Sequence, residues 1–208
     1  MNTDDFIACL AQTQAPATKW SWTFAASAAI GLGAASALFL LSAGSRPDLA
    51  TAWAPTLLKV SFGLIAALAL APFVWRATRP NVRLRETLAP AALFLAAAAA
   101  ISAIGLLTAP SELRWVIWTG GGAPDCLIRI PLISLPIAAA LFVAARRFAP
   151  TRLSFAGAAL GAMAGGLAAI PYSLFCPIDS APYVATWYSV SIAICALVGL
   201  LSSRALRW

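Results

Sequence analysis

Long apolar runs alternate with short polar breaks along almost the whole chain. A membrane-spanning helix needs about 20 mainly apolar residues. Six runs meet this requirement, over residues 21–43, 56–75, 88–108, 127–145, 154–174 and 184–202. The breaks between them are too short for a soluble domain. The pattern predicts an all-α fold, an integral membrane bundle of six transmembrane helices over residues 21–208, preceded by an N-terminal segment over residues 1–20.

The composition agrees with a membrane protein. Of the 208 residues, 62% are hydrophobic and 10% are charged, and the mean hydropathy is +0.87. A soluble domain carries about 25% charged residues, so we expect the lipid bilayer to surround this chain. In a soluble protein the net charge of +7 would suggest nucleic acid. Here the distribution of the basic residues explains it, and no direct contact with nucleic acid is expected.

The basic residues fall mainly on one side of the predicted membrane. If the N-terminus is cytoplasmic, ten of the 14 Lys and Arg residues lie in cytoplasmic segments, as the positive-inside rule requires. The outer side then holds Arg46, Lys59, Arg114 and Arg129. We expect Lys59 and Arg129, within a turn of the outer interface, to extend their side chains toward it. Six spans place both termini in the cytoplasm.

Few residues in the chain are suited to chemistry. Histidine is absent, which excludes imidazole ligation of a metal and Ser-His or Cys-His catalysis. No ionisable residue lies near mid-span, which disfavours ion or proton transport. We therefore expect neither an enzyme nor a resident cofactor. Four cysteines remain, at Cys9, Cys126, Cys176 and Cys195.

Cys126 and Cys176 lie at the outer ends of the fourth and fifth predicted helices. These helices are consecutive and antiparallel, so their outer ends should be neighbours. Packed helices lie about 8–10 Å apart, and a disulfide needs Cα atoms about 4.4–6.8 Å apart, so a small adjustment would join the thiols. The pair is either a static staple or a switch that responds to oxidation or to a soft metal ion. Asp125 and Asp179 carry oxygen atoms that would suit a metal.

Prolines interrupt several apolar runs. They are Pro72, Pro131, Pro136 and Pro171. We expect them to kink their helices or to break them near their ends. Both helices attached to Cys126 and Cys176 would then be irregular.

A stripe of small residues runs along the fifth predicted helix. Gly157, Gly161 and Gly165 recur at intervals of four, a spacing that allows another helix to approach closely. Two interpretations stay open, namely ordinary packing inside the bundle and the interface of a homodimer.

The N-terminal segment has the pattern of a short amphipathic helix. Thr3 can cap its first turn, where Asp4 and Asp5 suit the positive end of the helix dipole. Its apolar face consists of Phe6, Ile7 and Leu10. Such a face is typical of a helix that docks into the groove of a partner protein, and equally of a segment that lies on the membrane surface.

Several of these features together resemble the NrsF-type multi-pass membrane anti-sigma factors, which regulate extracytoplasmic-function sigma factors. The matching stretches are 1–7 (Met-Asn-Thr-Asp-Asp-Phe-Ile), the Cys126-Leu127 step, 176–180 (Cys-Pro-Ile-Asp-Ser), Trp187-Tyr188 and the basic end 204–208. Two positions depart from the family pattern. A histidine commonly precedes the second cysteine and an acid commonly follows the proline, whereas this chain has Phe175 and Ile178. A metal site built on those two side chains is disfavoured, while the thiols remain.

The resemblance implies a function and a set of site residues. It implies an inner-membrane anti-sigma factor that holds a sigma factor inactive and releases it when periplasmic cysteines sense oxidative or heavy-metal stress. Cys126 and Cys176 would be the sensor, surrounded by Asp125, Pro177, Asp179, Ser180, Trp187 and Tyr188. Thr3, Asp4, Asp5, Phe6, Ile7 and Leu10 would bind the sigma factor, helped by the basic stretches 79–85 and 146–152. The alternative is a small membrane thiol-redox protein, or a transporter or assembly subunit.

Overall fold

The computed structural model describes residues 20–44, 46–78, 88–122, 124–148 and 150–207. Six helical segments in these ranges are long and apolar enough to cross a membrane. Five are single helices, namely α2 (Trp20–Ala43), α3 (Trp53–Ala77), α4 (Leu88–Thr108), α6 (Cys126–Arg146) and α7 (Leu153–Ser173). The described part of the chain contains no strand. For the described residues, the predicted all-α fold with six helices long and apolar enough to cross a membrane is confirmed.

The sixth span is a composite rather than one regular helix. It begins with α8 (Ala181–Tyr183), passes through a π-helical turn, η2 (Val184–Tyr188), continues as α9 (Ser189–Leu201) and ends in a 3₁₀ turn, η3 (Ser202–Leu206). π-helical turns are rare and occur frequently at functional sites. This one follows the segment that carries Cys176, with only α8 between them.

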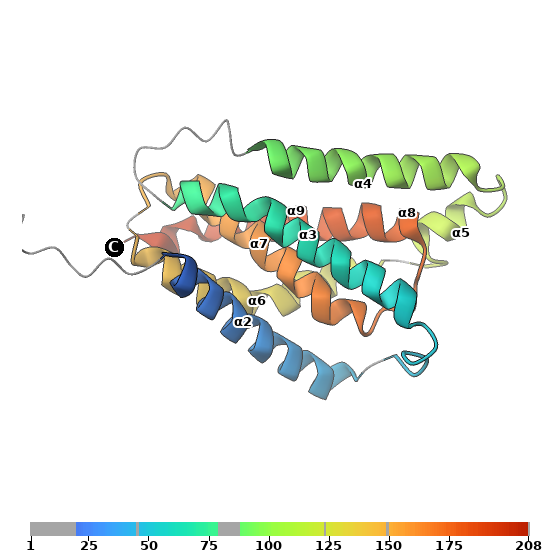
Figure 1. Ribbon diagram of the computed structural model, residues 1–208, viewed down its shortest axis with the longest axis horizontal. Coiled ribbons are helices and arrows are strands. Elements are labelled where there is room, and N and C mark those ends of the chain that lie inside the picture. The colour runs from blue at the N-terminus through green and yellow to red at the C-terminus, as the bar shows by residue number, and fades with distance from the viewer. Residues whose placement is uncertain (1–19, 45, 79–87, 123, 149, 208) are drawn as a thin grey trace, which may run out of the picture.

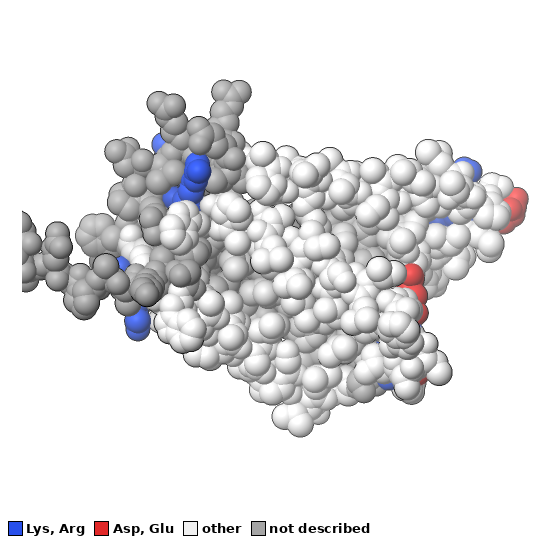
Figure 2. Space-filling view, viewed as in Figure 1, with Lys and Arg blue, Asp and Glu red and all other residues white. Residues whose placement is uncertain are grey.

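Successive spans run antiparallel, so their ends gather at two opposite ends of the bundle (Figure 1). The start of α2 and the end of η3 lie together at one end, which we call the terminal end. The other end carries residues 46–52, 109–125 and 174–180, and we call it the cysteine end. In Figure 2 the acidic surface lies at the cysteine end, and most of the basic surface lies at the terminal end. The predicted partner-binding residues 3–10 and the basic stretch 79–85 lie outside the described residues.

α7 is the central helix of the bundle. In its most apolar stretch 67% of the residues are buried, against 6% in α4, and it contacts α2, α3, α6 and α9. Its glycine stripe faces α9, because a Cβ atom added at Gly161 would lie 3.0 Å from the Cα atom of Gly199. Gly157 and Gly165 likewise contact the sixth span. The stripe therefore packs against the sixth span of the same chain, as in the first of the two interpretations, and the homodimer stays a prediction.

A bulky residue in this stripe should separate α7 from α9. We expect Gly161→Leu to destabilise the bundle by about 3 kcal/mol, the upper end of the usual cost of overpacking, because the contacting atoms include backbone that cannot move aside. Gly33→Leu in α2 is the matched control, since a Cβ atom there meets nothing within 4 Å. Thermal unfolding of the two purified variants in detergent measures the difference. Equal unfolding temperatures would contradict the assigned packing.

The prolines do not break their helices. Pro72 lies inside α3, Pro131 and Pro136 lie inside α6, and Pro171 lies inside α7, which ends two residues later. Pro72, Pro131 and Pro136 therefore do not end their helices, Pro171 lies near the end of its helix, and the expected kinks stay a prediction. Transmembrane helices tolerate proline because neighbouring helices and side chains satisfy the freed backbone groups. The irregular helix is instead the sixth span.

The cysteine end also contains a short helix that the sequence pattern did not predict. It is α5 (Arg114–Thr119), and it ends at Gly120, whose φ of +71° is in the left-handed region that favours glycine. Trp115 and Trp118 of this helix pack against each other, and Trp118 packs against Trp187 of η2. α5 therefore covers the start of the sixth span.

Candidate functional site

The structure places Cys126 and Cys176 at the same end of the bundle and in the same buried cluster. Cys126 is the first residue of α6, and Cys176 follows the last residue of α7 by three positions. Both are free thiols. Cys126 is 0% exposed and Cys176 is 1% exposed. The pair is therefore reduced and shielded from water in this structure.

Three tyrosines surround the thiols. They are Tyr172, Tyr183 and Tyr188, all at most 2% exposed, and they are all the tyrosines of the chain. The Tyr183 hydroxyl lies 3.5 Å from the Cys126 Sγ atom. The rings of Tyr172 and Tyr188 pack edge to face, with 5.7 Å between their centroids. The Tyr188 hydroxyl is buried and finds no hydrogen-bond partner among the described residues. The sequence analysis named Tyr188 but missed Tyr172 and Tyr183. The sequence could have indicated them, because every tyrosine of the chain lies between residues 172 and 188.

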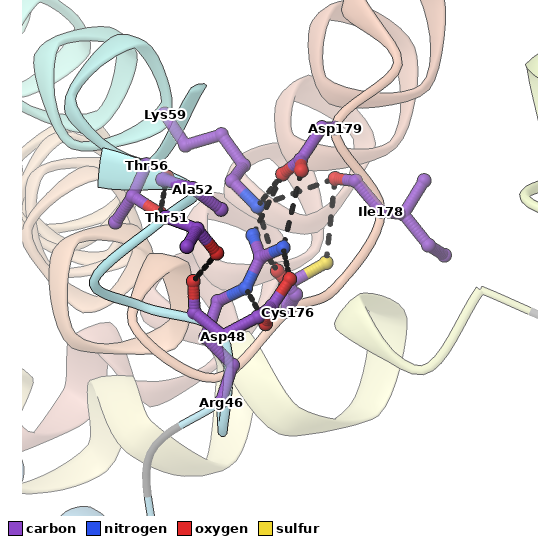
Figure 3. Close-up of polar contacts among 9 residues, drawn as sticks. All are labelled: Arg46, Asp48, Thr51, Ala52, Thr56, Lys59, Cys176, Ile178 and Asp179. Carbon is purple, nitrogen blue, oxygen red and sulfur yellow. Dashed lines mark hydrogen bonds and ion pairs between the residues drawn. The ribbon is translucent and has the colours of Figure 1, made fainter. Parts of the chain in front are cut away.

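Four charged residues form a cluster beside Cys176, shown in Figure 3. The Asp179 Oδ1 atom accepts hydrogen bonds from Arg46 Nη1 at 2.8 Å and from Lys59 Nζ at 2.7 Å. Arg46 also pairs with Asp48 at 2.8 Å. We call Arg46, Asp48, Lys59 and Asp179 the charge clamp. Arg46 precedes α3, Lys59 lies on α3, and Asp179 follows Cys176, so the clamp joins segments far apart in sequence.

The clamp also holds the backbone around Cys176. Lys59 Nζ donates to the carbonyl oxygen of Cys176 at 2.6 Å and to that of Ile178 at 3.3 Å. The backbone N–H of Arg46 donates to the carbonyl oxygen of Leu174 at 3.0 Å. The Lys59 side chain therefore extends toward the cysteine end, but it is only 2% exposed and ends in an ion pair rather than in water. Asp179 and two backbone carbonyls satisfy the buried ammonium instead.

Hydrogen bonds keep the carboxylates of the clamp ionised. The hydrogen bonds from Arg46, and after them those from Lys59, hold the pKa of Asp179 below its ordinary value of 3.8, although burial acts in the opposite direction. The Arg46 guanidinium likewise lowers the pKa of Asp48. At neutral pH the clamp therefore contains two cations and two anions. A carboxyl group with a lowered pKa stabilises the fold at pH values above its ordinary pKa, and that contribution is lost only as the pH falls through the lowered value.

The remaining predicted surroundings of the sensor lie nearby but do not form a ligand set. The Asp125 side chain is 67% exposed and lies 3.6 Å from Arg129, while Asp179 is engaged in the clamp. Among the described residues, no three His, Cys, Asp or Glu side chains are grouped to hold a metal ion. Ser180 Oγ donates to the Ile117 carbonyl oxygen and Trp187 Nε1 donates to the Trp118 carbonyl oxygen, each at 2.7 Å. Pro177 is exposed.

Arg129 provides a direct link between the two cysteine-bearing segments. Its guanidinium lies 4.7 Å from the centroid of the Phe175 ring, so a residue one turn after Cys126 packs on the residue just before Cys176. Beside this contact, between α2 and α6, lies an apolar cavity of about 600 Å³. Arg129 and Phe175 form part of its wall. The Arg129–Phe175 contact therefore joins the start of α6 to the segment that follows α7.

Comparison with known proteins decides the family. The family NrsF, described as negative regulator of sigma F, matches residues 10–208. The chain belongs to this family. A protein of Azospira oryzae named "Probable anti-sigma-F factor NrsF" is 34% identical, and the "Anti-sigma-F factor NrsF" of Caulobacter vibrioides is 31% identical, with both chains covered in full in each comparison. No solved structure matches this chain. Membership in the NrsF family supports negative regulation of a sigma factor rather than catalysis.

Proposed function

We propose that this protein holds an extracytoplasmic-function sigma factor at the cytoplasmic face of the bacterial inner membrane, and that Cys126 and Cys176 sense the stress that releases it. The observation that carries the proposal is the pair of free, buried thiols at the cysteine end of a six-span bundle. The names of the two relatives support the anti-sigma role. No residue of the proposal acts in catalysis.

The charge distribution supports the proposed orientation. Arg76, Arg146, Arg147, Arg152, Arg204 and Arg207 lie at the terminal end, where α3, α6 and η3 end and α7 begins. Asp48, Glu112, Asp125 and Asp179 lie in the segments of the cysteine end. By the positive-inside rule the terminal end faces the cytoplasm, so the cysteine end faces the periplasm. Residues 1–19, which would bind the sigma factor, continue from the start of α2 at the terminal end.

The thiols offer two chemical routes to a signal. A disulfide between the two Sγ atoms forms with loss of two protons and two electrons, which a periplasmic oxidant takes up. A soft divalent metal ion such as cadmium would instead displace the two thiol protons and bind both thiolates. Either product changes how the start of α6 meets the end of α7. Because α7 contacts four other spans, this change would spread through the bundle to the terminal end.

The signal must favour one of two arrangements of the bundle. A ligand shifts such an equilibrium only by its difference in affinity for the two states. The reduced, buried pair corresponds in our proposal to the state that holds the sigma factor. The disulfide or the metal complex would favour the state that releases it.

Affinity purification tests the proposal as a whole. The full-length tagged protein is extracted from membranes in mild detergent, and the co-purified proteins are identified by mass spectrometry. We expect a sigma factor among them, in an amount that falls when the cells are treated with cadmium ions or diamide before lysis. A tagged six-span protein of unrelated sequence is the control. The absence of any sigma factor from the purified material would contradict the proposal.

A further inference from the structure

The Cys176 thiol cannot react in the arrangement that the structure shows. The residue is 1% exposed, so a metal ion or oxidant in water does not reach the sulfur unless the segment 174–180 moves. The charge clamp holds this segment in place. We propose that Asp179, together with Lys59 and Arg46, positions the segment over the thiols, and that opening of the clamp sets how readily Cys176 reacts. The consequence for signalling rests on the proposed function, whereas the control of thiol access does not.

The segment depends on the clamp because it has little regular structure of its own. It connects α7 to α8 without forming a helix beyond a turn at its start. Its backbone is held by Lys59, which bonds to the carbonyl oxygens of Cys176 and Ile178, and by Arg46, whose guanidinium bonds to Cys176 and whose backbone N–H bonds to Leu174 in the turn. Ser180 adds one bond to α5. Most of these bonds therefore come from the residues of the clamp.

Asp179 is the residue on which the clamp depends. The side chains of Arg46 and Lys59 are 3% and 2% exposed, and both bond to this one carboxylate. Asp48 pairs with Arg46 and, among the described residues, forms no hydrogen bond or ion pair with Lys59. Without the charge on Asp179, Lys59 would keep only backbone carbonyls as partners. The Asp179 side chain is 32% exposed, but Lys59 is buried, so loss of the Asp179 charge leaves the Lys59 ammonium uncompensated, which is unfavourable. The segment would then open more often, which hydrates both cations.

The clamp also connects the segment that carries Cys176 with α3. Lys59 lies near the start of α3, which packs along α7 and ends at the opposite end of the bundle. When the segment opens, α3 loses its bonds to the Cys176 and Ile178 carbonyl oxygens. Asp179, Lys59 and Arg46 are in this sense positioning residues, since they act through Cys176 and do not themselves react.

Thiol labelling measures this opening directly. Membranes containing the full-length protein are treated with a charged maleimide, and labelling of each cysteine is followed over time by mass spectrometry. We expect Asp179→Asn, which keeps the shape of the side chain and removes its charge, to increase the labelling rate of Cys176 about tenfold or more. Asp179→Glu retains the charge and should restore a rate close to that of the wild type.

Two controls separate local opening from unfolding. Cys195 is 3% exposed in α9, so it should stay unlabelled in Asp179→Asn if the bundle remains folded. Glu112→Gln removes an exposed carboxylate at the same end, which bonds to Ser111 and lies outside the segment 174–180, and should leave the labelling of Cys176 unchanged. As a second variant of the clamp, Lys59→Met should also accelerate labelling of Cys176 while Cys195 stays protected.

Each outcome decides for or against the inference. Wild-type labelling of Cys176 in both Asp179→Asn and Lys59→Met would overturn it. Equal exposure of Cys176 and Cys195 in both variants would overturn it too, because the clamp would then be a general requirement for folding. If Cys176 alone becomes reactive, the inference holds, and sigma-factor release should then need less inducer. Faster labelling without any change in release would leave the clamp established and contradict the proposed function instead.

Discussion

Deletion of residues 2–12 is expected to free the sigma factor in the absence of any inducer. These residues contain the predicted capping residue Thr3 and the apolar face of Phe6, Ile7 and Leu10. In helix-in-groove complexes a few such apolar side chains carry most of the binding energy. The truncated protein should still insert into the membrane, since all six spans follow the deletion. The measurement compares the sigma factor bound to isolated membranes with transcription from a promoter that it controls.

Two point variants refine this result. Ile7→Asp places a charge on the apolar face and should cost at least about 2 kcal/mol of binding free energy, which is roughly thirtyfold in affinity. Gln14→Ala changes a polar residue beyond the face and should bind normally. Full retention of the sigma factor by the truncated protein would show that another part of the chain forms the binding surface.

Replacement of either sensor cysteine is expected to abolish induced release. Serine has nearly the shape of cysteine but forms no disulfide and binds soft metal ions poorly. Cys126→Ser and Cys176→Ser should therefore hold the sigma factor as the wild type does, and transcription after cadmium or diamide treatment should stay at the uninduced level. Reporter transcription and the membrane content of each variant are measured in parallel.

Cys195→Ser is the matched control for these variants. Cys195 is also a buried free thiol, but it lies within α9 and contacts Ser134 at 3.5 Å. Its partner Ser134 lies eight residues after Cys126 in α6, away from the segments of the cysteine end, so this variant should respond like the wild type. A normal response of both Cys126→Ser and Cys176→Ser would remove the thiols from the mechanism.

The spans could be predicted from the sequence because each is a long apolar run, and length alone distinguishes such a run from a loop. The finer structure could not be predicted in the same way. α5 has six residues, which is too few to show a helical period, and it ends at a glycine that also suits a loop. The π-helical turn in the sixth span has the same apolar composition as a regular helix, so no residue pattern indicated it.

The candidate site was only partly predictable, and the reason is geometric. Cys126 and Cys176 lie at adjacent ends of consecutive antiparallel helices, so topology alone brings them to one end of the bundle. The clamp joins Arg46 and Lys59 to Asp179 across 133 and 120 positions of sequence, and no local pattern encodes such a contact. Lys59 was expected at the membrane interface because a lysine near a helix end usually extends there. Burial of its ammonium group is favourable because Asp179 lies opposite it, and the sequence does not show that contact.

The central claim is that the chemistry of two thiols at one end of the bundle controls a sigma factor at the other. Its most direct test uses spheroplasts that carry a Cys9→Ser, Cys195→Ser variant, in which Cys126 and Cys176 are the remaining cysteines. A membrane-impermeant oxidant is added outside, and the sigma factor that stays bound to the membranes is quantified. We expect the bound fraction to fall sharply, and to remain constant when Cys126 is also replaced by serine. An unchanged bound fraction despite complete oxidation of both thiols would contradict the claim.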